Sequence, residues 1–199
     1  MEKIGCIVMA SGNSARYGRN KLLEKVGDRE VILHTVNQAA AAGLAPLTVT
    51  RSSAVNDLLE HSGFPCILHD RPRKSDTIHI GLEKLEADLA GYLFIPGDQP
   101  LVLPDTLRRM IRRFYTAPDQ AVRLAFSGTA GSPVLFPARF RKDLLSYEGE
   151  RGGIEVLNRS GAVCTLVSAA YEWELWDADT PENMDQIREI WRQRNPLDQ

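Results

Sequence analysis

The stretch "IGCIVMASGNSARYGRNKLL", residues 4–23, decides the fold and raises the first question about function. An apolar run of the kind found in buried strands gives way to small and basic residues before the sequence turns hydrophobic again. Glycine, serine and alanine let backbone N–H groups approach a ligand closely, while Arg16, Arg19 and Lys21 supply positive charge. This loop is therefore predicted to lie against an anion.

Strand-like and helix-like segments alternate along the rest of the chain. Runs rich in β-branched residues predict strands at residues 4–10, 46–51, 65–70, 91–98, 121–127, 132–137 and 162–169. Segments of helical period predict helices at residues 31–42, 54–61, 75–87, 105–115 and 139–147, with a last helix that begins at Thr180 and Pro181. Such alternation predicts an α/β fold: a single Rossmann-like three-layer domain over residues 1–199, with a mostly parallel mixed sheet.

The bulk composition argues against several classes of partner. The chain of 199 residues has a net charge of −2, without the basic excess that nucleic-acid binding usually requires. No apolar run approaches the roughly 20 residues that span a bilayer, and the first residues do not resemble a signal peptide. We expect a cytoplasmic protein without nucleic-acid or membrane partners. The three cysteines are far apart and suggest neither a disulfide framework nor a metal site.

The opening loop matches neither of the two common phosphate-binding motifs. Ser14 stands where a dinucleotide fingerprint needs glycine, and Tyr17 stands where a P-loop needs one. The remaining pattern, A-S-G-x-S-x-R-x-G-x-x-K, provides backbone donors and ends on cations, so it suits a triphosphate. A Gly/Ser-rich surface loop with solvated charges is the alternative. In doubly wound sheets ligands bind beyond the carboxyl ends of the strands, which places the loops after residues 10, 51, 70 and 95 around one cleft.

Two acidic segments supply candidate metal ligands. Asp98 in "YLFIPGDQPLV" follows a strand and provides the carboxylate oxygens that Mg²⁺ prefers, although an aspartate at this place is also a common turn residue. Asp177 and Asp179 in "LWDADTPENM" precede the last helix, where aspartates also serve as caps. We expect these two carboxylates to point to opposite faces, so that only Asp177 reaches the metal.

These segments resemble the nucleotidyltransferases that attach a nucleotide to molybdopterin, and most closely the molybdenum cofactor cytidylyltransferases. The similar features are "ASGNSARYGRNKLL", "KSDTIHIGLE", "GDQPLV", "GSPVLFP", "GERGG" and "DADTPEN", which cover nearly the whole chain. The resemblance implies a fold of the nucleotide-diphospho-sugar transferase type. It implies transfer of CMP from CTP to molybdopterin with release of pyrophosphate, and a product that a molybdenum enzyme receives.

The resemblance also assigns roles to residues. It implies that Asp98 and Asp177 hold Mg²⁺ and that Lys21, Arg16 and Asp98 are catalytic. It implies a nucleotide site made of Met9, Ala10, Ser11, Gly12, Arg16, Lys21, Asp70 and Asp98. Because the attacking phosphate of molybdopterin is ionised at neutral pH, no protein base is needed, and catalysis consists of positioning and charge neutralisation.

Some features leave the interpretation open. A related transferase that uses GTP or a sugar phosphate acceptor is one alternative, and a non-catalytic carrier or chaperone of the cofactor is another. The Ala-x-Gly opening and "GDQP" favour cytosine within the family. Arg73 stands where the family usually has glycine, and it either crowds its loop or adds a phosphate contact. The alternation in "YEWELW", residues 171–176, predicts a half-buried strand.

Overall fold

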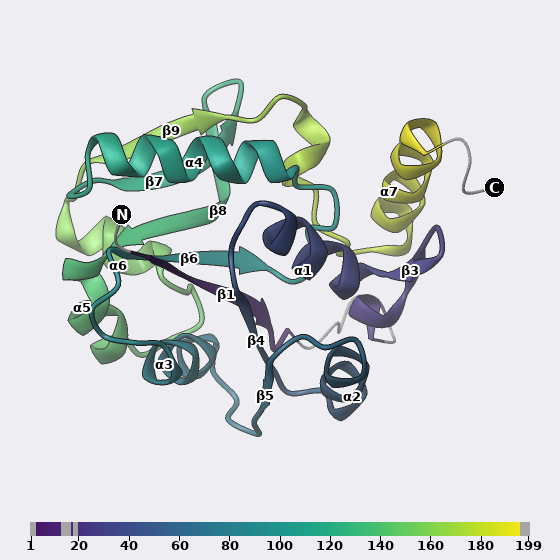
Figure 1. The fold of residues 1–199 in the computed structure, drawn as a ribbon, viewed down its shortest axis with the longest axis horizontal. Coiled ribbons are helices and arrows are strands. Elements are labelled where there is room, and N and C mark those ends of the chain that lie inside the picture. The colour runs from purple at the N-terminus through teal and green to yellow at the C-terminus, as the bar shows by residue number, and fades with distance from the viewer. Residues whose placement is uncertain (1–2, 13–16, 18–19, 196–199) are drawn as a thin grey trace.

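The computed structural model describes residues 3–12, 17 and 20–195 and has a seven-stranded sheet at its centre (Figure 1). The strand order is β5-β4-β1-β6-β8-β7-β9. The strands are β1 (Ile4–Ala10), β4 (Pro46–Thr50), β5 (Cys66–Leu68), β6 (Gly91–Pro96), β7 (Ala121–Phe126), β8 (Thr129–Pro137) and β9 (Cys164–Ser168). Strand β8 runs antiparallel to both of its neighbours, and every other pair is parallel. The prediction of a mostly parallel mixed sheet is confirmed.

Helices cover both faces of this sheet and complete the three layers (Figure 1). One face packs against α1 (Val31–Ala41), α2 (Ser53–His61), α4 (Pro104–Thr116) and α7 (Pro181–Arg194). The other face packs against α3 (Lys74–Lys84), α5 (Arg141–Ser146) and α6 (Ile154–Ser160). Apolar residues of β1 alternate between the two cores, because successive side chains of a strand point to opposite faces. None of the described helices is long and apolar enough to cross a bilayer.

The last helix begins as its sequence predicts. The Thr180 hydroxyl accepts a hydrogen bond from the backbone N–H of Asn183, and Pro181 occupies the first helical position. Near the N-terminus, a short hairpin of β2 (Lys25–Val26) and β3 (Arg29–Glu30) was not predicted from the sequence. This hairpin follows the 3₁₀ turn η1 (Lys21–Leu23), and α7 packs beside it.

The predicted strand at residues 171–176 is wrong. Residues Glu172–Leu175 form the 3₁₀ helix η3, in which the Glu174 side chain is completely buried. Its carboxylate accepts hydrogen bonds from the backbone N–H groups of Leu103, Ala170 and Tyr171 at 3.2, 2.7 and 3.2 Å. A buried carboxylate needs such donors, so this satisfied acceptor outweighs the alternating pattern. One more 3₁₀ turn and helix α6 also differ from the elements predicted: η2 (Ala138–Phe140) replaces the start of the helix at 139–147, and α6 was missed.

Candidate functional site

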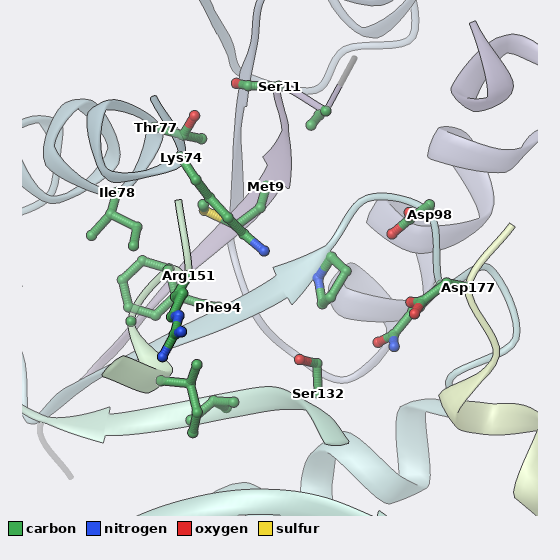
Figure 2. A pocket seen from close by; sticks show the side chains of 18 of the residues that line it. Met9, Ser11, Lys74, Thr77, Ile78, Phe94, Asp98, Ser132, Arg151 and Asp177 are labelled. Atoms are coloured by element: carbon green, nitrogen blue, oxygen red, sulfur yellow. The ribbon is translucent and has the colours of Figure 1, made fainter. Parts of the chain in front are cut away.

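A cavity of about 830 Å³ opens where β1 and β6 end. The segments that follow β1, β4, β5 and β6 all contribute to its wall, as the carboxyl-end rule predicts. Strand β8, the segment before α6 and the segment before α7 complete it. Figure 2 shows Asp98 and Asp177 at one end of this cavity and Lys74 and Arg151 toward the other, so the cavity has an acidic end and a basic end.

Lys21 lies at the acidic end and binds two carboxylates. Its ammonium group donates hydrogen bonds to Asp98 and, at 2.6 Å, to Oδ1 of Asp179. Burial alone lowers the pKa of Lys21, but the two neighbouring carboxylates outweigh burial, and the net direction is upward. Lys21 is therefore a fixed cation at neutral pH. Turn η1 holds it there, because the side chain of Asn20 caps the turn by accepting a hydrogen bond from the Leu22 N–H at 3.1 Å.

Close packing around Gly97 sets the position of Asp98. The Gly97 N–H donates to the Met9 carbonyl at 2.9 Å, and the Gly97 carbonyl accepts from the Thr35 hydroxyl at 3.1 Å. A Cβ atom on residue 97 would lie 3.1 Å from both the Met9 carbonyl oxygen and a methyl group of Ile32. Close packing at residue 97 therefore favours glycine, and the carboxylate of the following Asp98 lies on the cavity wall.

Asp177 and Asp179 both line this cavity, and the expectation that they face opposite ways is wrong. Residues two apart along extended backbone share a face, so their spacing gives no reason for opposite directions. The backbone N–H of Asp179 also bonds to the Asp177 carbonyl at 2.8 Å and forms a tight bend at Ala178. The N–H of Ala178 in turn donates to the Asp98 carbonyl at 3.0 Å. This bond ties the two acidic segments together.

The electrostatics at this end favour a cation. The pKa of Asp177 is raised to about 6, first because protein atoms enclose its carboxyl group and then because the Asp98 carboxylate is near, while a hydrogen bond from Gln99 partly offsets both. In the described part of the chain, no three histidine, cysteine or acidic side chains form a ready metal cage. Mg²⁺ commonly takes one or two protein carboxylates and completes its shell with phosphates and water, so Asp98 and Asp177 fit as its ligands.

The predicted nucleotide loop forms another wall of the cavity. Met9, Ala10, Ser11, Gly12, Lys21 and Asp98 all line it, whereas Arg16 lies outside the described residues. The Ser11 hydroxyl donates to the Val49 carbonyl at 3.2 Å and lies 2.8 Å from Nε2 of His69. Arg51 Nε donates to the Ser11 carbonyl at 2.9 Å. Ser11 thereby anchors the start of the loop to two neighbouring strand ends.

Asp70 is not brought to the cavity. It is exposed and is absent from the cavity wall, whereas its neighbour His69 bonds to Ser11. The N–H of His69 continues the parallel ladder by donating to the Thr50 carbonyl at 3.0 Å. Because side chains alternate along extended backbone, the inward position of His69 turns Asp70 outward. Burial and the nearby Arg51 cation lower the pKa of His69.

Several wall residues were not singled out from the sequence, among them Arg51, Lys74, Thr77, Arg123 and Ser132. Arg73, which the sequence left open, lies on the wall and pairs with Glu148 at 2.7 Å. The N–H of Ser75 also bonds to the Gly149 carbonyl at 3.1 Å. These contacts join the start of α3 to the segment that carries "GERGG", and they bring Arg151 to the basic end.

The fold matches those of solved structures over nearly the whole chain. A nucleotidyl transferase from Methanothermobacter superposes with a TM-score of 0.82 at 23% identity, covering 97% of this chain and 99% of that one. The Mycobacterium tuberculosis protein Rv0371c, solved in one structure with manganese, gives a TM-score of 0.77 at 22% identity over 94% of this chain and 98% of that one. At these identities the likeness establishes the fold.

The curated relatives include probable molybdenum cofactor guanylyltransferases and proteins called bifunctional protein GlmU. A probable molybdenum cofactor guanylyltransferase of Pyrococcus horikoshii is 28% identical over 116 residues, covering 56% of this chain and 57% of that protein. The corresponding protein of Thermococcus sibiricus is 25% identical and shares 55% of each chain, so the matches span little more than half the length of these relatives. The model of the MobA-like NTP transferase domain matches residues 6–163, and the chain belongs to that family.

Proposed function

We propose that this nucleotidyltransferase is Mg²⁺-dependent and transfers CMP from CTP to molybdopterin. A terminal phosphate oxygen of molybdopterin attacks the α-phosphorus of CTP, the bond to the β-phosphate breaks, and pyrophosphate leaves. The acceptor oxygen is already ionised at neutral pH, so the reaction needs no protein base. The observation that carries the proposal is the placement of Lys21 beside Asp98 and Asp179, opposite Asp177, at the acidic end of the cavity.

The residues of this chain position and neutralise the reactants. The backbone of residues 9–12 lines the cavity, where N–H groups are available to the nucleotide, and Lys21 supplies a fixed charge for the phosphates. Arg16 adds a second cation in this proposal. Such preorganised charges accelerate transfer because they need no rearrangement as negative charge develops at the α-phosphate.

Asp98 and Asp177 are the residues that would hold the metal. When bound, a divalent cation neutralises phosphate oxygens and orients them for displacement. The raised pKa of Asp177 supports this role, because carboxylates that repel each other are relieved by a cation between them. A similar protein from M. tuberculosis has been solved with manganese, which fits a site for divalent metal.

Two nucleotides, CTP and GTP, are candidates for the substrate. The Ala10-Ser11-Gly12 opening and the "GDQP" sequence favour cytosine, whereas the named relatives are probable guanylyltransferases, which favours GTP as the second candidate. A site of fixed backbone donors and acceptors rejects a base whose polar edge it leaves unpaired. We expect CTP to be used at least about tenfold more efficiently than GTP, the discrimination provided by one well-placed hydrogen bond.

Pyrophosphate release tests this proposal in one assay. The protein is incubated with molybdopterin and Mg²⁺, with either CTP or GTP, and pyrophosphate and the dinucleotide product are quantified. Faster formation of the cytosine dinucleotide supports the proposal, and a preference for GTP assigns the second candidate. Binding of the cofactor without pyrophosphate release from either nucleotide identifies a carrier and rejects the transferase mechanism.

A further inference from the structure

Arg123 lies on the cavity wall and has no role in the reaction proposed above. Its neighbours in β7, Val122 and Leu124, are buried in the core beneath α4, so alternation turns Arg123 to the opposite face of the sheet. Its partner across the ladder, Val134 of β8, lines the cavity as Arg123 does. The register of β7 and β8 shifts between Arg123 and Ala125, and irregularities of this kind redirect side chains next to binding sites.

The guanidinium of Arg123 keeps most of its donors for a ligand. Its Nε donates to the Gly131 carbonyl at 3.2 Å, which fixes the plane of the group. Among the residues that the structure describes, no carboxylate pairs with Arg123 and no acceptor contacts its two terminal nitrogens. Lys21 at the acidic end differs, because it already forms ion pairs with two carboxylates. A half-buried cation without a counter-ion is suited to an anionic ligand.

The surroundings of Arg123 specify the kind of anion. Thr129 and Ser132 bring hydroxyl groups to the same wall, and Figure 2 shows the Ser132 hydroxyl pointing into the cavity. A guanidinium fork with neighbouring hydroxyls matches the geometry of phosphate. The adjoining surface, formed by Phe94, Val134 and Phe136, is apolar, which suits a planar ring.

We infer that Arg123 and Ser132 bind the terminal phosphate of the acceptor, and that the apolar surface beside them receives its ring. The inference rests on the proposed function for the identity of the acceptor. It gives the two substrates separate cations: Lys21 serves the nucleotide, and Arg123 orients the attacking phosphate monoester. The acceptor is accordingly recognised by its phosphate as well as by its heterocycle.

Calorimetric binding of two pterins tests this assignment without any turnover. The probes are 6-hydroxymethylpterin monophosphate and 6-hydroxymethylpterin, which differ only in the phosphate. We expect the parent protein to prefer the phosphorylated probe, and Arg123→Gln to reduce this preference at least about tenfold, as expected for loss of charge-assisted hydrogen bonds. Ser132→Ala should reduce it about fivefold, the effect of one ordinary hydrogen bond. If Arg123→Gln does not fold, the Ser132→Ala variant tests the assignment in its place.

Arg141→Gln is the matched control. Arg141 is also half-buried and donates to a main-chain carbonyl, that of Leu82 at 2.8 Å, but it does not line the cavity. The control should keep the phosphate preference of the parent. Equal binding of both pterins by the parent, or an unchanged preference in Arg123→Gln, would overturn the assignment.

Kinetics separate this inference from the proposed function. With molybdopterin as acceptor, Arg123→Gln should raise the KM for the acceptor and leave the KM for CTP within about twofold, because a separate cation serves the nucleotide. If pyrophosphate is never released yet Arg123 determines the phosphate preference, the transferase proposal fails and the phosphate site stands. If pyrophosphate is released and Arg123→Gln changes only the KM for CTP, the reverse holds.

Discussion

The ammonium nitrogen of Lys21 lies 2.6 Å from Oδ1 of Asp179, although 158 residues separate them in the sequence. Lys21 also donates to Asp98, so a single cation joins the segments that follow β1 and β6 to the segment before α7. Charge is thus preorganised where the three segments meet. The ion pairs keep Lys21 protonated and hold its side chain toward the cavity.

Replacing this cation should abolish most of the activity. We expect Lys21→Ala to lower kcat by about a hundredfold or more, the usual effect of removing a donor that stabilises a developing charge. Steady-state kinetics with CTP and molybdopterin measures the change, and circular dichroism checks the fold. Parent-like turnover by a folded Lys21→Ala variant would assign Lys21 a structural role only.

Substitutions of the two aspartates before α7 should affect catalysis in different ways. Asp177→Asn removes a proposed metal ligand, so more Mg²⁺ should be needed for half-maximal activity. Asp179→Asn removes one of the two carboxylates that pair with Lys21, so kcat should fall while the Mg²⁺ requirement changes little. The sequence analysis expected only Asp177 at the metal, and the contact to Lys21 gives Asp179 a separate role. Mg²⁺ titrations of both variants distinguish the roles, and an equal shift of the requirement in both would place both carboxylates at the metal.

The sequence was sufficient for the elements that depend on local pattern. All seven strands of the main sheet follow from runs of β-branched residues, and the carboxyl-end rule correctly brought the opening loop and Asp98 to one cavity. The common face of Asp177 and Asp179 could have been predicted from their two-residue spacing. The tight bend at Ala178 could not, because it involves a bond to the Asp98 carbonyl far away in the sequence. Arg123 was missed because the local alternation gives the face on which it lies but not the cavity on that face, which depends on the pairing of β7 with β8.

Gly97 offers a test of how precisely Asp98 must be placed. A methyl group at residue 97 would lie 3.1 Å from the Met9 carbonyl oxygen, closer than ordinary packing allows, and backbone cannot yield as a flexible side chain does. We expect Gly97→Ala to displace Asp98 and to lower both the affinity for Mg²⁺ and the stability, the latter by about 1–3 kcal/mol. Thermal unfolding and Mg²⁺ titration measure the two effects. Full stability with unchanged Mg²⁺ affinity would show that this packing does not position Asp98.

The pKa of Asp177 predicts how metal binding depends on pH. In the metal-free protein this pKa is about 6, so the carboxylate is ionised at neutral pH and protonated below 6. A proton on the ligand competes with the cation, so affinity for Mg²⁺ should be constant above pH 7 and fall about tenfold for each pH unit well below 6. Calorimetric titration with Mg²⁺ between pH 5 and pH 8 measures the dependence.

Asp177→Asn provides the control for this pH dependence. The amide does not titrate, so the variant should bind Mg²⁺ weakly and without the decline centred near pH 6. The affinity lost with acid is then specific to one carboxyl group, since the ordinary pKa of an aspartate lies about two units lower. If the parent keeps its full affinity at pH 5, or if Asp177→Asn shows the same decline as the parent, a group other than Asp177 controls binding of the metal.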